Sequence, residues 1–235
     1  MFTESARYYD DIYKTKDYAA EAAEVAHVIH THDPSARSIL DCGCGTGEHA
    51  RRLHEGYGFD VDGVDLNQGL IDIASRKNPH GTFAQGDMSN FQLGRRYDTV
   101  ICLFGSIGYL LTIDRVAAAL ACFRDHVRDG GMILVEPWFE PGQMTPGRVY
   151  MHSAETSEVK ICRVSQSTIH QRISRLHFEY LIGDGDGIHH LVEDHELGLF
   201  TRDEMLHAFG EANLDAAYQS EAPTGRGLYV ARRKV

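Results

Sequence analysis

A glycine-rich loop that directly follows a short apolar segment constrains this chain more than any other feature. Residues 38–47 read Ser-Ile-Leu-Asp-Cys-Gly-Cys-Gly-Thr-Gly, so an apolar pair leads into Asp41 and then into three glycines. This pattern predicts a buried strand that enters a tight turn, where the backbone approaches a ligand more closely than a Cβ atom allows. A second apolar strand, expected at about 59–65, ends in Asp65, an acid suited to hold a ribose diol. Together these features predict a nucleotide-type cofactor site.

The first part of the chain alternates strand and helix signals, which is typical of a parallel sheet with helices on both faces. We expect strands at about 38–42, 59–65, 82–85, 98–104 and 132–138. We expect helices at about 17–31, from near Thr46, around Leu70 and at 113–127, the last ending at Asp129-Gly-Gly131. The sequence therefore predicts an α/β fold with a doubly wound, mostly parallel sheet.

The pattern changes to alternating polar and apolar residues between about 148 and 200, which indicates antiparallel strands with one face in water. Gly183-Asp-Gly-Asp-Gly187 predicts a turn between two of them. A helix and two strands are expected after this region. We therefore expect an α/β domain formed by residues 1–138 and 201–235, with residues 139–200 inserted as an antiparallel β flap. The flap would cover the carboxyl ends of the parallel strands, where open α/β sheets bind ligands.

Details of the loop distinguish between cofactors. A dinucleotide site usually reads Gly-x-Gly-x-x-Gly, whereas here the third glycine comes one residue early and Asp41 stands before the loop. A carboxylate there would repel a pyrophosphate but can orient a cationic amino-acid group. The pattern Leu-Asp-x-Gly-Cys-Gly-Thr-Gly resembles the first motif of class I S-adenosylmethionine-dependent methyltransferases. Gly86-Asp87-Met88 and the strand Tyr97–Phe104 match later segments of that family.

This resemblance implies a Rossmann-like fold, S-adenosyl-L-methionine as cofactor and methyltransferase activity. Asp65 matches the acid that binds the ribose hydroxyls, and Asp87 matches the acid that faces the adenine amine. Three tyrosines before the first strand either close over the sulfonium or pack into the core. The residues expected to bind the cofactor are Tyr9, Tyr13, Tyr18, Asp41, Gly43, Cys44, Gly45, Asp65, Leu66, Asp87, Met88 and Leu103.

Motifs in the flap and near the C-terminus narrow the resemblance. Segments similar to the N,N-dimethyltransferases of nucleotide-linked (dTDP) amino sugars in macrolide-type antibiotic pathways are Glu136–Phe139, Thr145–Gly147, Arg163–Ser165, Leu199–Arg202 and Pro223–Leu228. The similarity extends over nearly the whole chain. It implies an N-methyltransferase that transfers a methyl group in line to a neutral sugar amine. The residues expected to contact the sugar nucleotide are Ser106, Tyr109, Glu136, Trp138 and Arg226.

Two of these residues have alternative roles. Tyr109 stands where the resembled sugar enzymes tend to carry histidine, and a phenol of pKa about 10 is a poor base at neutral pH but a good hydrogen-bond partner. It is the expected catalytic residue, positioning the amine or an adjacent hydroxyl, and the alternative is an aromatic wall of the pocket. Arg226 resembles an arginine that meets the diphosphate, and between glycines we expect it to be accessible. Its alternative is a surface arginine in a turn.

Composition limits the partners and the location. The net charge of −11 argues against a nucleic-acid substrate. No apolar run approaches the roughly 20 residues of a membrane span, and the N-terminus lacks a signal-peptide core. Five cysteines without a Cys-x-x-Cys pair indicate a reduced, cytoplasmic protein. His189, His190 and His195 share one presumed flap strand, but no metal-ligand motif accompanies them, and no metal site is expected.

Two other functions stay open at this point. One is a small-molecule methyltransferase with a different amine, hydroxyl or carboxylate acceptor. The other is a non-catalytic cofactor-binding protein on the same fold. The tyrosine at position 109, in place of a histidine, is the one feature that favours it. The sequence also leaves open which sugar and which amine position are used, one methylation or two, and whether the chain forms a homodimer.

Overall fold

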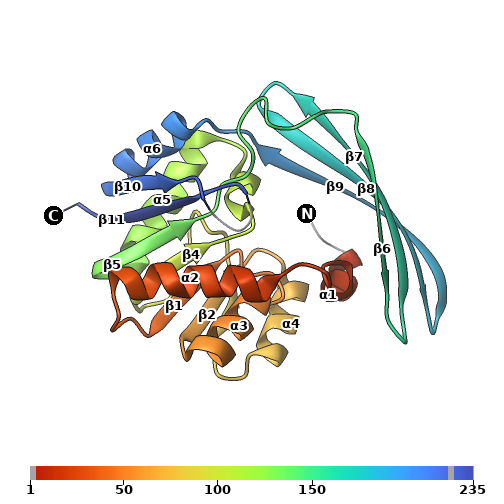
Figure 1. The fold of residues 1–235 in the computed structure, drawn as a ribbon, viewed down its shortest axis with the longest axis horizontal. Helices are drawn as coiled ribbons and strands as arrows, with labels where there is room; N and C mark the ends of the chain where they lie inside the picture. Colours follow the sequence, from red (N-terminus) through yellow and green to blue (C-terminus); the bar gives the residue numbers. More distant parts are fainter. Residues whose placement is uncertain (1–3, 222–224, 235) are drawn as a thin grey trace.

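The main layer of the molecule is a seven-stranded sheet with helices on both faces (Figure 1); the computed structural model describes residues 4–221 and 225–234. The strand order is β10 (Leu214–Gln219), β11 (Leu228–Arg233), β5 (Val127–Val135), β4 (Tyr97–Cys102), β1 (Ser38–Cys42), β2 (Asp60–Asp65) and β3 (Phe83–Gln85). Strands β5, β4, β1, β2 and β3 are parallel, and β11 is antiparallel to both neighbours. The predicted doubly wound, mostly parallel sheet is confirmed.

Successive residues of the parallel strands point to opposite faces of the sheet and pack into two hydrophobic layers. Ile39 and Ile101 pack with helices α2 (Tyr18–His32) and α3 (Glu48–Tyr57) on one face. Leu40 and Val100 pack on the other face with helices α5 (Ile113–His126) and α6 (Arg202–Glu211). Helix α4 (Gln68–Lys77) packs beside β2 and β3. A sheet covered on both faces leaves its strand ends as the place where ligands can enter.

A second, antiparallel sheet follows β5 in the chain. Its strands are β6 (Val149–Glu155), β7 (Lys160–His170), β8 (Ile173–Asp184) and β9 (Gly187–Gly198), in that order. The predicted turn lies between β8 and β9. In Figure 1 this sheet stands apart from the main sheet, and the short N-terminal helices η1 (Glu4–Tyr8) and α1 (Tyr9–Ile12) lie between the two. Tyr8 and Ile12 pack against the inner face of the four-stranded sheet, on Ile161 and Tyr180.

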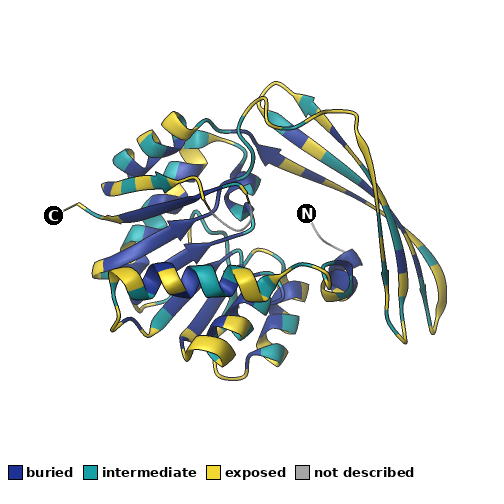
Figure 2. Ribbon diagram, viewed as in Figure 1, coloured by how far each residue is buried: buried dark blue, intermediate teal, exposed yellow. Residues whose placement is uncertain are grey.

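Burial differs between the two sheets, as Figure 2 shows. The central parallel strands β1 and β4 are almost wholly buried, whereas the four-stranded sheet alternates buried and exposed residues, as the sequence pattern predicts for a sheet with one wet face. Its outer face exposes large apolar side chains, among them Met151, Leu181, Ile188 and Val192. None of the helices within the described ranges is both long and apolar enough to cross a membrane.

Two boundaries differ from the sequence prediction by more than a residue or two. β5 begins at Val127, because Gly130, at φ +76°, allows an irregularity in its pairing with β4 without ending the strand. Its carboxyl end comes at Val135, so Glu136 lies beyond it, bonded through its backbone N–H to the carbonyl of Cys102. Helix α3 begins at Glu48, within two residues of its expected start near Thr46, since Gly47 at φ +72° lies outside the helical region.

Candidate active site

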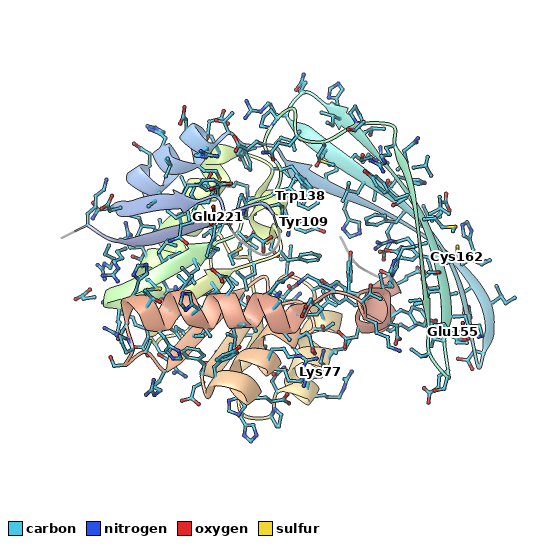
Figure 3. All side chains as sticks on the ribbon, viewed as in Figure 1. Lys77, Tyr109, Trp138, Glu155, Cys162 and Glu221 are labelled. Atoms are coloured by element: carbon cyan, nitrogen blue, oxygen red, sulfur yellow. The ribbon has the colours of Figure 1, made fainter. Side chains whose placement is uncertain are left out.

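A cavity of about 280 Å³ lies at the carboxyl ends of the parallel strands and extends to the inner face of the four-stranded sheet. The strand order reverses at β1, because β2 and β3 follow on one side of it and β4 and β5 on the other. Open α/β sheets bind ligands at such a switch point. The wall includes Gly43 and Asp65 from the main sheet and His195 from β9. Figure 3 shows Tyr109 and Trp138, two further wall residues, between the two sheets.

The loop after β1 is shaped by close packing and by Asp65. Gly43 has φ +80°, and a Cβ atom built on it would lie 2.8 Å from the Cβ of Ser106. Side chains are therefore excluded at this position. Asp65 Oδ2 accepts from the Gly45 N–H at 2.9 Å, and Oδ1 accepts from the Asn67 N–H at 2.9 Å. Burial raises the pKa of Asp65 above its ordinary value, although these backbone donors act to lower it. A carboxylate fixed in this way still has lone pairs for a diol.

Asp87, Met88 and Leu66 form another part of the same wall. Although burial opposes it, the donors of Ser89 and Arg115 hold the pKa of Asp87 below its ordinary value. Arg115 Nη2 lies 2.7 Å from Asp87 Oδ2. Leu66 is 47% exposed, so it forms the rim of the cavity. The sequence predicts that all three bind the cofactor, and in the fold all three line one cavity.

The N-terminal tyrosines gather at the cavity. Tyr9 and Tyr13 line it, with ring centroids 4.8 Å apart, and the ring of Tyr13 meets Phe104 edge-on at 5.6 Å. Tyr18 lines a smaller adjoining cavity of about 30 Å³, together with Cys44 and Leu103. A cation already lies on this aromatic group, because Lys16 Nζ is 3.9 Å from the Tyr18 ring centroid.

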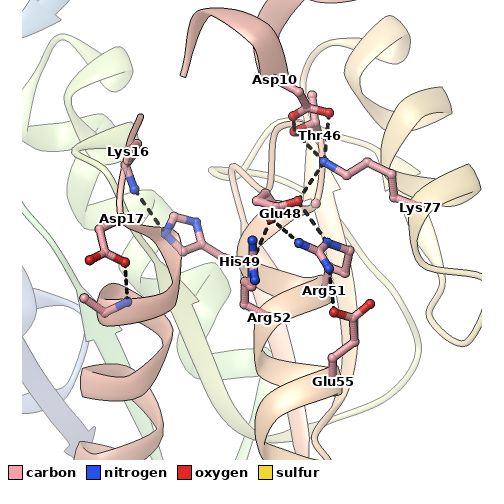
Figure 4. Close-up of polar contacts among 12 residues, drawn as sticks. Asp10, Lys16, Asp17, Thr46, Glu48, His49, Arg51, Arg52, Glu55 and Lys77 are labelled. Carbon is pink, nitrogen blue, oxygen red and sulfur yellow. Dashed lines mark hydrogen bonds and ion pairs between the residues drawn. The ribbon is translucent and has the colours of Figure 1, made fainter. Parts of the chain in front are cut away.

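Polar contacts hold the N-terminal segment against the start of α3 (Figure 4). Thr46 Oγ1 donates to Asp10 Oδ1 at 2.7 Å, and Lys77 Nζ bridges Asp10 at 2.9 Å and Glu48 at 3.0 Å. These contacts connect the helix that carries Tyr9 to the loop that carries the glycines. The aromatic side of the cavity and its glycine-rich side are thereby held in one arrangement.

Asp41 lies beneath the loop and is 1% exposed. Burial raises its pKa to about 6. Within the described residues its Oδ2 atom has no hydrogen-bond partner. Asp41 lines neither of the two cavities formed by the described residues, so the one feature that fits the predicted cationic amino-acid group is this buried acceptor without a donor. Cys44 is also buried, and its Sγ atom would lie 2.7 Å from a Cβ built on Gly63, which identifies it as a packing residue of the loop.

Glu136 and Arg226 form a buried ion pair. Their side chains are 5% and 11% exposed, and Glu136 Oε1 accepts from both Nε, at 2.9 Å, and Nη2 of Arg226. Glu136 Oε2 accepts from the Phe104 N–H at 2.7 Å. The expectation that Arg226 is openly accessible is wrong, because Glu136 holds it against the rings of Phe104 and Trp138. Neither charged side chain forms part of the cavity wall drawn from the described residues. Pro223 and Thr224 of the predicted motif lie outside the described ranges.

Tyr109 meets a histidine that the sequence did not mark as a site residue. Its hydroxyl lies 2.7 Å from His195 Nδ1, and both side chains line the cavity. Burial raises the pKa of Tyr109 and lowers the pKa of His195. The sequence does predict that His195 and Leu197 lie on the same face of β9, because side chains alternate along a strand. It does not show which face of the strand turns toward the cavity.

Trp138 closes the cavity beside this pair. Its indole Nε1 donates to Ser174 Oγ at 3.0 Å, which ties it to β8. A Cβ built on Gly105 would lie 2.7 Å from the indole ring, and one built on Gly108 would lie 3.0 Å from the Trp138 Cβ. Ser106 lies at the junction of the two cavities. Among the described His, Cys, Asp and Glu side chains, no group of three or more is arranged to hold a metal ion.

Comparison with known proteins decides the family. A family described as "Methyltransferase domain" matches residues 39–131. A dTDP-3-amino-3,6-dideoxy-α-D-glucopyranose N,N-dimethyltransferase of Streptomyces fradiae is 40% identical over 230 residues, 97% of this chain and 90% of the relative. A dTDP-3-amino-3,4,6-trideoxy-α-D-glucopyranose N,N-dimethyltransferase of Streptomyces venezuelae is 36% identical over 94% of each chain. The chain belongs to the family of dTDP-amino-sugar N,N-dimethyltransferases.

Solved structures agree with membership of this N,N-dimethyltransferase family. Streptomyces venezuelae DesVI superposes with a TM-score of 0.92 at 34% identity and covers the whole of both chains. CalS10, an amino pentose methyltransferase from Micromonospora echinaspora solved with SAM bound, superposes with a TM-score of 0.85 at 34% identity, over 100% of this chain and 98% of CalS10. The similarity therefore includes the four-stranded sheet as well as the generic methyltransferase layer.

Proposed function

We propose that this chain is an S-adenosyl-L-methionine-dependent N-methyltransferase of a dTDP-linked amino sugar in natural-product biosynthesis. The observation that carries the proposal is the single cavity that joins the glycine-rich loop to the inner face of the flap. One compartment thus borders both a cofactor-type wall, with Asp65 and Asp87, and a wall with Tyr109 and His195. The full-length similarity to enzymes named for dTDP-amino sugars supports the choice of substrate.

The residues at the strand ends fit the proposed cofactor, which supplies a methyl group already activated for displacement when it is bound. We assign the ribose hydroxyls to Asp65, whose carboxylate is fixed by two backbone N–H groups. Asp87 and Met88, which line the cavity, would face the adenine side, and Asp41 would offer its Oδ2 acceptor to the amino-acid ammonium. Tyr9 and Tyr13, which line the same cavity, would present aromatic faces to the cationic centre.

On the substrate side, we assign the amine to the part of the cavity near Ser106, Tyr109 and Trp138. Apolar walls there exclude water and align the neutral amine with the methyl group, which is most of what an in-line displacement requires. The diphosphate would meet Arg226 only after that side chain exchanges Glu136 for phosphate oxygens. Arg163 is a second guanidinium near the site, since it packs 5.5 Å from the Tyr13 ring centroid and 4.9 Å from that of Phe178.

Three broader expectations belong to the same proposal. Residues 139–200 act as a substrate-binding flap inserted in the domain formed by 1–138 and 201–235, and the enzyme works in the cytoplasm. The exposed apolar side chains on the outer face of the flap, such as Met151 (74% exposed) and Ile188 (78% exposed), support a homodimer through that face. Sedimentation velocity across a concentration series tests the homodimer, and a monomer at every concentration contradicts it.

The decisive experiment is methyl transfer to a dTDP-amino sugar from S-adenosyl-L-methionine, followed by mass spectrometry that separates one added methyl group from two. The matched comparison uses the bare amino sugar, and free thymidine diphosphate should compete with the nucleotide sugar. Equal rates on both sugars would favour a small-molecule methyltransferase with another acceptor. Cofactor binding by calorimetry without transfer to any amine would favour the non-catalytic alternative.

A further inference from the structure

A buried chain of polar groups begins at the cavity wall and ends in the N-terminal helix η1. The Tyr109 hydroxyl lies 2.7 Å from His195 Nδ1, and His195 Nε2 lies 3.6 Å from Glu193 Oε2. Glu193 in turn accepts from Ser5, at 2.6 Å from its hydroxyl and 3.1 Å from its N–H. Ser5 and His195 are fully buried, and Glu193 is 5% exposed. Contacts thus connect three elements that are distant in sequence: η2 (Ser106–Leu110), β9 and η1.

The position of Glu193 favours one tautomer of His195, although the 3.6 Å between Nε2 and Glu193 Oε2 is an ion-pair distance and is longer than a hydrogen bond. A neutral imidazole has one N–H and one bare nitrogen. If Nδ1 carried the proton, the bare Nε2 would face a carboxylate oxygen, and two acceptors would oppose each other. The favoured tautomer therefore directs Nε2–H toward Glu193 and leaves Nδ1 to accept the Tyr109 hydroxyl. The Tyr109 oxygen keeps its lone pairs for a donor inside the cavity.

The surroundings keep both members of this pair uncharged at neutral pH. Burial lowers the pKa of His195, which outweighs the opposite effect of Glu193, so the imidazole is available as a proton acceptor. Burial raises the pKa of Tyr109, so the phenol keeps its proton until His195 takes it. Among the described residues, the charged or titratable groups that act on the pair include Tyr13 on the N-terminal segment, Asp65 at the end of β2, Arg163 on β7, Tyr180 on β8 and Glu193 on β9 itself.

We propose that the Tyr109–His195 pair takes the proton from the substrate ammonium and so prepares the neutral amine for methyl transfer, an inference that rests on the proposed function. The ammonium N–H bond breaks as its proton forms a bond to the Tyr109 oxygen, and the original phenolic proton moves to His195 Nδ1. The products are a neutral amine, an intact phenol and an imidazolium beside Glu193, with total charge unchanged. His195 acts through Tyr109 and is a positioning residue in this scheme. The imidazolium returns its proton to water before a second methylation.

The test is the pH dependence of kcat with saturating cofactor and dTDP-amino sugar for Tyr109→Phe and His195→Asn. The amide oxygen of asparagine can occupy the Nδ1 position and accept the Tyr109 hydroxyl, but it takes no proton, so this variant separates orientation from proton acceptance. We expect both variants to lose about 100-fold in kcat at about pH 7, the scale of general-base catalysis. The loss should shrink to within about threefold at about pH 10, because the amine then arrives neutral.

The control is His190→Gln, which changes a histidine of the same strand on its outer face, paired there with Glu179. Its pH profile should match the wild type. A loss that is equal at every pH, or no loss in His195→Asn with unchanged cofactor affinity, would overturn the relay. Tyr109→Phe removes one hydroxyl and carries the same test if His195→Asn does not fold. A wild type that methylates no dTDP-amino sugar refutes the proposed function, whereas an active wild type with parallel profiles refutes the relay alone.

Discussion

The buried pair of Glu136 and Arg226 gives a prediction whose size follows from its burial. Arg226→Met keeps the length of the side chain but leaves the Glu136 carboxylate without its partner, at 5% exposure among aromatic rings. Breaking one side of a buried pair costs about 3–5 kcal/mol. We therefore expect a loss of about 3–4 kcal/mol in the free energy of unfolding, at the lower end of that range because the Phe104 N–H still donates to the carboxylate.

Urea unfolding at pH 7 measures this loss, with thermal unfolding as a second probe. A domain of this size shifts its Tm by about 2–4 °C for each kcal/mol, so Arg226→Met should unfold about 6–16 °C lower. The double variant Glu136→Gln, Arg226→Met should recover more than half of the loss, since the amide oxygen can still accept the Phe104 N–H while the buried charge is gone. Arg175→Met is the matched control, because Arg175 also contacts its carboxylate, Asp194, through two nitrogens, but is 54% exposed.

The control should lose less than about 1 kcal/mol, as exposed pairs do. If Arg226→Met loses no more than the control, or if the double variant is no better than the single one, the buried-pair reasoning fails and Arg226 is free for a ligand. The double variant also isolates the diphosphate question in a stable protein. A 10- to 100-fold rise in its KM for the dTDP-amino sugar, beyond that of Glu136→Gln, would assign Arg226 to the diphosphate.

Three further predictions concern the main sheet and its loop. Asp65→Ala should weaken S-adenosyl-L-methionine binding by about 1.5–3 kcal/mol in calorimetry, and an unchanged affinity would remove Asp65 from the site. Gly43→Ala should abolish the cofactor-induced rise in Tm through the 2.8 Å contact with Ser106, and Ser106→Gly should restore part of it if the clash is the cause. Although burial opposes it, hydrogen bonds hold the pKa of Asp98 at about 2. The stability from Asp98 is therefore present above the unfolded-state pKa of about 4 and lost as pH falls from about 4 to about 2. Asp98→Asn should flatten the acid decline of the unfolding free energy in that window, and an unchanged slope would contradict this.

The fold was largely predictable because its signals are local. The strand and loop at 38–47 can be predicted without any distant contact, because apolar residues, an acid and three glycines follow one another directly. The three glycines have positive φ in the structure. The helix at 113–126 shows its buried stripe in its own periodicity, with Val116, Leu120 and Phe123 all inward. Periods of 2 and 3.6 residues are properties of single elements, so one sequence reveals them.

The contacts that decide chemistry were not predictable, because they join distant segments. Tyr109 and His195 are 86 residues apart, and Arg226 and Glu136 are 90 apart. Alternation along β9 groups His195 with Glu193 and Leu197, but the docking of the flap decides that this group faces the cavity. The prediction for Arg226 failed for the same reason: glycines on both sides indicate an accessible backbone, and they carry no information about a carboxylate arriving from the end of another strand.

The N-terminal segment connects these observations. It carries Tyr9 and Tyr13 into the wall of the cavity, while the hydroxyl of Ser5 in the same segment donates to Glu193, the neighbour of His195 on the inner face of β9. Its Asp10 is fixed to Thr46 at the start of α3. A ligand that orders this segment on one side of the cavity therefore favours the arrangement needed on the other side. This short helical segment contacts the four-stranded sheet on one side and helix α4 and the glycine-rich loop on the other, so the proposed position of the amine between the two sheets depends on it.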